Sequence, residues 1–373
     1  MIRHRPTVAV VDLEAVRHNV RALKPPRAEF LAVVKANGYG HGAEQVARVA
    51  LEAGATWLGV ALVEEGIRLR DSGIRAPILA LTQFPAGSEK EALAAGLTPT
   101  VYTEEGLARL SEAAAATGGP TGVHVKLDTG MHRVGLPPER ALDFVRAVAA
   151  AGLEVEGLWT HFAMSEDLDD PFTEVQLRRF LDEVDRLKAA GIRPRYLHTA
   201  NSGAAIAHPA SHLDLVRIGL GMYGLVPGQA LAGMADLRPA MSWRTAVSMA
   251  KRVHADEGIS YGLRYRLERE STIATVPVGY ADGYSRLLGG KAEVLVRGSR
   301  HPVVGNVTMD QLMVDCGDEP VETGDEAVLM GRQGGEEITA EDLAGWMGTA
   351  NYEIVCMVSE RVPREYVDEV ASG

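Results

Sequence analysis

The chain has 373 residues, and its 50 acidic residues outnumber its 38 Lys and Arg residues, giving a formal net charge of -12. This charge argues against a nucleic acid or an anionic membrane as a partner, because both would be repelled. Hydrophobic residues make up 46% and charged residues 24%, as in ordinary globular proteins, and the length predicts two domains.

The termini and the cysteines give no sign of export or of a metal site. Cys316 and Cys356 do not stand at a zinc-ligand spacing, and so few cysteines are typical of a reducing compartment. Asp12 and Glu14 interrupt the first apolar run, so we expect no signal peptide. The sequence also has no uncharged apolar run of about 18 residues, the length that spans a membrane. We therefore expect a cytoplasmic protein without a bound metal.

Up to about residue 225, short apolar runs alternate with amphipathic segments. Several runs are apolar throughout, which is typical of parallel strands buried on both faces. The longest amphipathic segment, 172–190, predicts a helix, and its apolar residues near one face are Val175, Phe180, Val184 and Leu187. The eight predicted strands are Phe30–Ala36, Trp57–Leu62, Pro77–Leu81, Pro99–Tyr102, Val123–Leu127, Val155–His161, Tyr196–His198 and Asp214–Ile218.

Eight strand–helix units in about 215 residues predict an α/β domain, a (β/α)8 TIM-type barrel, over residues 10–235. An open, doubly wound sheet is the alternative architecture. We favour the barrel because eight parallel strands in sequence usually close into a ring.

After a linker at Val226–Ala240, strand-like runs alternate with glycine turns, which predicts a mainly antiparallel β domain over residues 236–373. We expect one short helix at Ala340–Met347, capped by Thr339. The predicted strands are Thr272–Val278, Glu293–Val296, Pro302–Val304, Gln311–Val314 and Glu326–Met330.

The segment AVVKANGYGHG places Lys35 at the end of the first predicted strand. Strand ends of a barrel face its active site, where a lysine can form a Schiff base with an aldehyde cofactor or a carbonyl substrate. A lysine whose charge merely reaches solvent at the strand end explains Lys35 alone equally well. Gly38, Gly40 and Gly42 would let the backbone approach a ligand closely.

The segments HTANSGAAI and VRIGLGMYG follow the seventh and eighth predicted strands. Loops at these positions of a barrel commonly bind phosphate through backbone N–H groups. Ser202 can add a hydroxyl donor, and Gly219 can bring its N–H close. Ordinary turn chemistry would explain either segment alone. Combined with Lys35, however, a phosphate site indicates pyridoxal phosphate.

The segment VKLDTGMHRVG follows the fifth predicted strand and brings Lys126, Asp128 and Arg133 to the barrel mouth. Arg133 could bind a carboxylate or the phenolic oxygen of the cofactor through charge-assisted hydrogen bonds. A structural ion pair between Arg133 and Asp128 is the alternative interpretation.

Three further polar residues stand at predicted strand ends. His161 and His198 are consistent with a structural role or with a site at the rim. Arg217 ends the eighth strand and could face the pyridine nitrogen of the cofactor. A cation there would oppose a proton on that nitrogen, and we hypothesise that it thereby suppresses transamination.

Together, the motifs resemble bacterial alanine racemases in kind and in order, and they span nearly the whole chain. This set is more specific than any single motif. The resemblance also implies that about the first nine residues join the second domain as a strand. The segments that carry it are AVVKANGYGHG, VKLDTGM, HTANSG, RIGLGMYG, ISYG, GYADGY, TMDQ and NYEI.

The resemblance implies interconversion of L- and D-alanine by a two-base mechanism with pyridoxal 5'-phosphate, supplying D-alanine for peptidoglycan. Lys35 would be the Schiff-base lysine and one base, and Tyr261 the other. A homodimer is implied, in which Tyr261 and Met309 reach the partner's site. Arg133 and Met309 would hold the substrate carboxylate, and Lys126 would be carbamylated and hold Arg133. The implied cofactor-binding residues are Lys35, Tyr39, His161, Asn201, Ser202, Arg217, Gly219, Leu220 and Tyr352.

Three positions depart from the family pattern or lie where it varies. His132 stands where the family commonly has glycine, and Asn306 and Thr308 precede Met309 in a variable segment. These positions bear on substrate preference. A racemase of broader specificity, a pyridoxal-phosphate decarboxylase of similar design and a cofactor carrier without turnover are the alternatives. The decarboxylase fits the ISYG, TMDQ and NYEI segments poorly.

Overall fold

The computed structural model describes residues 5–117 and 122–368, which divide by their contacts into two compact units. The barrel unit comprises Val16–Gly38 and Gly42–Arg238. The C-terminal unit comprises the described residues of Met1–Ala15, Tyr39–His41 and Pro239–Gly373. The sequence-based boundaries, 10–235 and 236–373, do not anticipate that Tyr39–His41 belongs with the C-terminal unit.

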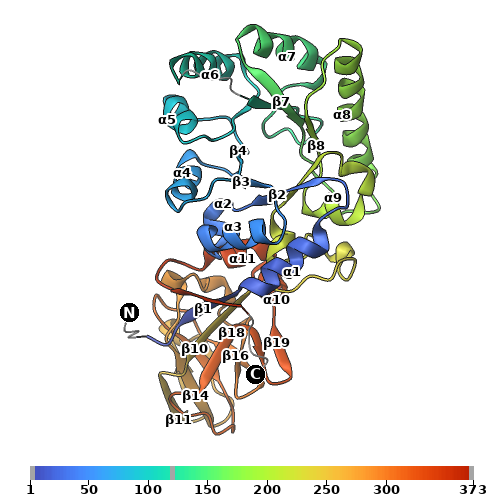
Figure 1. Cartoon of the computed structure of the whole chain (residues 1–373). Coiled ribbons are helices and arrows are strands. Elements are labelled where there is room, and N and C mark those ends of the chain that lie inside the picture. The colour runs from blue at the N-terminus through green and yellow to red at the C-terminus, as the bar shows by residue number, and fades with distance from the viewer. Residues whose placement is uncertain (1–4, 118–121, 369–373) are drawn as a thin grey trace. The chain divides into compact units, whose positions relative to one another are not determined.

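The barrel unit contains eight parallel strands in two four-stranded arrays, ordered β4-β3-β2-β9 and β5-β6-β7-β8 (Figure 1). Backbone hydrogen bonds join the arrays at both edges. Ala80 N donates to Thr98 O at 3.0 Å, and Asp214 N donates to Leu197 O at 3.0 Å. The ring therefore closes, and the predicted barrel is confirmed over the open sheet. The strands are β2 (Glu29–Val33), β3 (Trp57–Val60), β4 (Ile78–Ala80), β5 (Thr100–Val101), β6 (Gly122–Lys126), β7 (Glu154–Trp159), β8 (Tyr196–His198) and β9 (Leu215–Ile218).

Helices follow the strands and cover the outside of the ring (Figure 1). The longest, α8 (Phe172–Ala189), matches the helix predicted over 172–190, and it buries Phe180, Val184 and Leu187 against the barrel unit. Burial of this apolar stripe stabilises the helix more than its intrinsic propensity does. The other helices are α1 (Leu13–Leu23), α3 (Ala43–Glu52), α4 (Val63–Asp71), α5 (Glu89–Ala94), α6 (Glu104–Thr117), α7 (Ala141–Ala150) and α9 (Ser202–Ala207).

The C-terminal unit is built on one sheet with the strand order β11-β14-β17-β16-β15-β18-β10-β1-β20, and β19 pairs with β18. Neighbouring strands are antiparallel except β1 and β20, which are parallel. Thus β1 (Val8–Asp12) adds a strand from the N-terminal part of the chain. The remaining strands are β10 (Met241–Ala246), β11 (Met249–Val253), β14 (Ser271–Val276), β15 (Glu293–Val296), β16 (Ser299–Val304), β17 (Leu312–Asp315), β18 (Glu326–Gln333), β19 (Glu336–Ile338) and β20 (Arg364–Val367).

Smaller elements complete the C-terminal unit. Helix α10 (Ala340–Met347) has its predicted cap, because Asp342 N donates to Thr339 Oγ1 at 3.0 Å. A second helix, α11 (Asn351–Met357), was not expected from the sequence. The short strands β12 (Gly258–Ile259) and β13 (Tyr265–Arg266) form a separate antiparallel ribbon.

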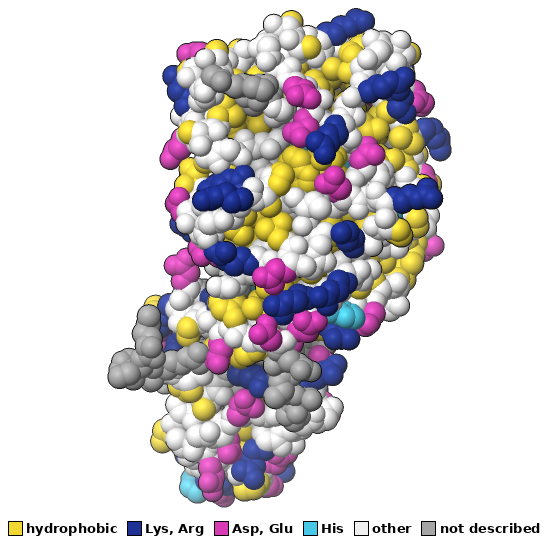
Figure 2. Space-filling view, in the orientation of Figure 1, with side chains coloured by type: hydrophobic (Ala, Val, Ile, Leu, Met, Phe, Trp, Pro, Cys, Tyr) yellow, Lys and Arg dark blue, Asp and Glu magenta, His cyan; other side chains and the backbone are white. Residues whose placement is uncertain are grey.

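Figure 2 shows acidic and basic side chains interspersed over the displayed face of the described residues, without a continuous basic area. Among the described residues, each helix is too short or too polar to cross a membrane.

Candidate active site

A group of cationic and imidazole side chains gathers at the carboxyl ends of the barrel strands. Lys126 ends β6, Arg217 lies in β9, and Lys35 and Arg133 follow β2 and β6. Burial, together with the charges of Arg217, Arg133 and Lys35, lowers the pKa of Lys126 to about 7. Burial and the same cations hold the pKa of His161 well below its usual range. Four cations this close together favour an anionic ligand.

Arg217 is buried and its guanidinium is held by backbone carbonyls and imidazoles. Nη2 donates to Thr160 O at 2.7 Å and to Thr199 O at 3.0 Å. Nη1 lies 3.1 Å from Nδ1 of His198, and Nη2 lies 3.3 Å from Nδ1 of His161. A guanidinium can only donate, so His198 accepts from Nη1 through its Nδ1 and carries its proton on Nε2.

The imidazole of His198 continues this chain of hydrogen bonds into the barrel. Nε2 of His198 lies 2.8 Å from Nδ1 of His124, so His198 donates and His124 accepts. Burial, with the nearby charge of Arg217, lowers the pKa of His124 to about 3 and keeps it neutral. The chain ends there, because Nε2 of His124 lies 3.8 Å from Glu156 Oε2, beyond hydrogen-bonding distance. Sequence reasoning missed His124, and it placed His198 at the rim rather than in this buried chain.

The residues after Lys35 form a left-handed turn instead of extending the strand. Ala36, Asn37 and Tyr39 have φ values of 51°, 52° and 49°. The predicted strand Phe30–Ala36 is therefore wrong at its end, since β2 stops at Val33. Left-handed backbone costs a non-glycine residue about 1–2 kcal/mol. Such strain is typical of functional sites, where the surroundings impose it.

Hydrogen bonds and a close approach impose this turn. Asn37 accepts the N–H of Ala43 through Oδ1 at 3.0 Å and that of Gly42 through its carbonyl at 2.8 Å. Gly40, with φ of 81°, could not carry a side chain, because its Cβ would lie 2.2 Å from Val355 O. The glycines in this motif were a sequence signal for the turn, whereas Ala36 and Asn37 gave none.

The loops after β8 and β9 converge on one hydroxyl group. Ser202 Oγ accepts the N–H groups of Gly219 at 3.1 Å and Gly221 at 3.3 Å. Asn201 caps α9 by accepting the N–H of Ala204 at 3.0 Å. Leu220 begins the short 3-10 helix Leu220–Tyr223. Two backbone N–H groups of the loop after β9, gathered at a hydroxyl of the loop after β8, fit a phosphate group.

Arg133 is not held by the ion pair that the alternative interpretation required. Asp128 Oδ1 instead accepts the N–H groups of Gly130 and His132, each at 3.0 Å. Within residues 5–117 and 122–368, the Arg133 guanidinium has no ion-pair partner, so its charge remains for a ligand. His132 has φ of 54°, a conformation that glycine adopts most easily.

The C-terminal unit presents Tyr261 and Met309 on its surface, with 75% and 53% of their area exposed. Both line a cavity of about 630 Å³. Tyr280 N donates to Thr308 O at 3.0 Å, and Ala281 N donates to Met309 O at 3.1 Å. The segments GYADGY and TMDQ therefore form one structural unit. The other cavity-lining residues are Tyr280, Arg286, Asn306, Val307, Thr308, Asp310 and Gln311.

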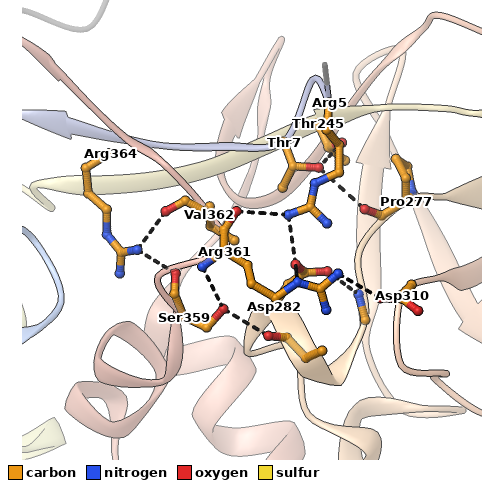
Figure 3. Close-up of polar contacts among 12 residues, drawn as sticks. Arg5, Thr7, Thr245, Pro277, Asp282, Asp310, Ser359, Arg361, Val362 and Arg364 are labelled. Carbon is orange, nitrogen blue, oxygen red and sulfur yellow. Dashed lines mark hydrogen bonds and ion pairs between the residues drawn. The ribbon is translucent and has the colours of Figure 1, made fainter. Parts of the chain in front are cut away.

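A charged network supports the Met309 segment (Figure 3). The buried carboxylate of Asp282 accepts from Arg5 at 2.8 Å and from Gly279 N at 3.0 Å, and lies 3.6 Å from Arg361. Arg361 in turn donates to Asp310, the residue after Met309, at 2.8 Å. Sequence reasoning did not single out Asp282 or Arg361, because their link joins segments far apart in the chain.

The two units divide the expected site residues between them. Tyr352 is half-exposed at the start of α11 in the C-terminal unit. The barrel unit holds Lys35, Lys126, Arg133, His161, Asn201, Ser202, Arg217, Gly219 and Leu220, and the C-terminal unit holds Tyr39, Tyr261, Met309 and Tyr352.

Comparison with known proteins identifies the family to which both units belong. The alanine racemase N-terminal domain matches residues 11–227, and the alanine racemase C-terminal domain matches residues 240–366. The chain belongs to the alanine racemase family. The alanine racemase of Symbiobacterium thermophilum is 50% identical to it, over 98% of each chain.

Solved alanine racemases share the fold. The structure from Streptomyces lavendulae matches with a TM-score of 0.95 and 41% identity over 99% of each chain. The alanine racemase from Bartonella henselae matches with a TM-score of 0.88 and 26% identity, over 97% of this chain and 99% of that one. That structure contains covalently bound pyridoxal phosphate. These matches confirm the predicted fold and enzyme class, an alanine racemase rather than a decarboxylase.

Proposed function

We propose that this alanine racemase binds pyridoxal 5'-phosphate at the barrel mouth and moves the α-proton of alanine between two bases, Lys35 and Tyr261. The observation that carries the proposal is the gathering of Lys35, Lys126, Arg133 and Arg217 beside the donor-rich loops at Ser202. This arrangement fits a phosphorylated cofactor and a carboxylate substrate. When bound, the cofactor withdraws electrons from the amino acid and makes its α-proton acidic.

Each part of the cofactor has candidate partners in the chain. Ser202, the backbone around Gly219 and Leu220, and the hydroxyls of Tyr39 and Tyr352 would hold the phosphate. Lys35 would hold the aldehyde carbon, and His161 would lie beside the ring. Arg217 would face the ring nitrogen, and as a pure donor it requires that nitrogen to accept.

Racemisation needs one base on each face of the substrate, because a single base would return the proton to the side it came from. Lys35 comes from the barrel unit, just after β2. Tyr261 stands on an exposed turn of the C-terminal unit. Arg133, whose charge has no ion-pair partner among the described residues, would bind the substrate carboxylate with Met309.

The exposure of Tyr261 and Met309 supports a homodimer, in which both side chains reach the barrel of the partner subunit. A large aromatic ring and a thioether, exposed together at one cavity, are typical of an interface. In a two-fold dimer, each subunit would complete the site of the other.

Lys126 would carry a carbamate. Its pKa of about 7 leaves much of the amine neutral near neutral pH. A neutral amine adds to carbon dioxide, forming an N–C bond and releasing a proton. The resulting anion would pair with Arg133 and hold it toward the substrate. As the resemblance implies, the D-alanine formed would serve peptidoglycan synthesis in the cytoplasm.

Proton NMR in heavy water tests the two-base proposal, with L-alanine, added pyridoxal phosphate and circular dichroism in parallel. Loss of the α-proton signal together with decay of optical activity to zero is the expected result. Exchange with retained chirality would mean that one base works and would overturn the proposal. The same assay with larger amino acids separates an alanine-specific enzyme from a racemase of broader range.

A further inference from the structure

The turn that carries Tyr261 has an unusual backbone. Ser260 has φ of 65° and ψ of -176°, a combination that is essentially restricted to glycine. Gly262 and Leu263 follow with φ values of 76° and 47°. Serine and leucine hold such conformations only where their surroundings impose them, so the contacts of this turn determine where Tyr261 points.

Asn306 makes a reciprocal pair of hydrogen bonds with this turn. Its Nδ2 donates to the carbonyl of Tyr261 at 2.7 Å. Its own carbonyl accepts the hydroxyl of Ser260 at 2.8 Å. One bond holds the carbonyl of Tyr261 itself, and the other holds the side chain of the residue before it, Ser260. A rotation of this turn would have to break one of them.

Gly305 brings Asn306 into range. A Cβ atom at this position would lie 2.7 Å from Ser260 Cβ and 2.8 Å from Ile259 O, and its φ is 67°. Any other residue would therefore push the two segments apart. Below the turn, Ile259 pairs with Tyr265 in the β12–β13 ribbon, so the base of the turn is fixed as well.

We propose that Asn306 is a positioning residue that holds Tyr261 for proton transfer. The inference rests on the proposed role of Tyr261 as a base. The sequence suggested a link between Asn306 and substrate preference, but the amide of Asn306 is engaged with the backbone of the Tyr261 turn. Proton transfer is sensitive to sub-ångström displacement of the base. Removal of the Asn306 amide should therefore slow turnover rather than weaken substrate binding.

The test follows α-proton exchange separately from L- and D-alanine in heavy water, with the holoenzyme. Tyr261→Phe first identifies the enantiomer whose exchange depends on the tyrosine. Asn306→Ala should slow exchange from that enantiomer by about tenfold, and change exchange from the other enantiomer and the KM for alanine by less than about twofold. Asn306→Asp, which keeps the shape but replaces the donor with an acceptor, should slow it at least as much.

Ser260→Gly gives a second route if the Asn306 variants do not fold. Glycine suits the backbone at this position but lacks the hydroxyl that bonds to Asn306, so the same enantiomer should exchange more slowly. Ser248→Ala is the control, because it removes a hydrogen bond of the same unit, to Thr275 O, away from this turn. It should leave both exchange rates unchanged.

The outcomes separate the two proposals. Equal slowing for both enantiomers, unchanged exchange or a change in KM alone would each overturn the role of Asn306 while leaving Tyr261 as a base. Exchange from both enantiomers in Tyr261→Phe at wild-type rates would overturn the proposed function, and the inference with it.

Discussion

Arg217 donates a hydrogen bond to Nδ1 of His198 at 3.1 Å, and this contact sets the direction of the buried chain. We expect His198→Phe to lower the free energy of unfolding by about 1–3 kcal/mol, because a buried donor loses its acceptor. His198→Gln should recover part of this loss, since its amide oxygen can accept. Urea unfolding measures both variants, and equal stabilities for Phe and Gln would contradict the account.

Arg217 also bears on reaction specificity. A guanidinium opposes a proton on the ring nitrogen of the cofactor, whereas a carboxylate would favour one. Arg217→Glu should therefore raise transamination relative to racemisation, measured as pyruvate formed per alanine racemised. Arg217→Lys retains the positive charge and serves as the control. An unchanged ratio in the Glu variant would rule out this role.

A shared active site predicts complementation between two inactive variants. A dimer of one Lys35→Ala chain and one Tyr261→Ala chain has one intact site, supplied with lysine by one subunit and tyrosine by the other. Random exchange makes half of the dimers mixed, so the mixture should regain up to about a quarter of wild-type activity. Subunit exchange must be shown independently, by native mass spectrometry. Persistent inactivity after proven exchange would mean that each site belongs to one chain.

Lys126 should make stability depend on pH when it carries no carbamate. Its pKa falls from the usual 10.5 to about 7 in the folded protein, so the unfolded chain binds the proton more tightly. The folded state therefore gains stability as pH rises from about 7 to 10, by up to about 1.4 kcal/mol per pH unit. Below this pH range, the folded protein bears the full free-energy cost of keeping the buried Lys126 protonated.

The measurement compares urea unfolding of the wild-type protein and Lys126→Met at several pH values, in buffer freed of carbon dioxide. The free energy of unfolding of the wild-type protein should increase relative to that of the variant as pH rises. Added bicarbonate should flatten the difference, because a carbamylated nitrogen no longer takes up the proton. A constant difference without carbon dioxide would show that Lys126 is not the titrating group.

The barrel could be predicted because its strands are buried on both faces. Runs such as Trp57–Val60 are apolar throughout, and each one stood out from the helices around it. In the C-terminal unit, β10 and β11 were missed for opposite physical reasons. β10 mixes apolar and polar residues that are mostly buried between β1 and β18, whereas β11 is largely exposed. Neither strand has the alternation that a half-buried strand shows.

Sequence analysis predicted those residues of the candidate site that lie in local motifs. Lys35 and Ser202 lie at or just after the ends of predicted strands, and in a barrel these strand ends face the active site. His124 could not be found, since a strand buried on both faces does not reveal which side chains point into the barrel. Asn306 and Asp282 act through contacts between segments far apart in the chain, and these depend on the fold.

The left-handed turn after Lys35 has a consequence for chirality itself. Positive φ values strain an L-residue because its Cβ crowds the following carbonyl, but they suit the mirror-image residue. A chain assembled by chemical ligation with D-alanine at position 36, where φ is 51°, would relieve that strain without changing any side chain. The enantiomer this enzyme makes from L-alanine is thus the one that its own backbone would accommodate better beside the proposed catalytic lysine.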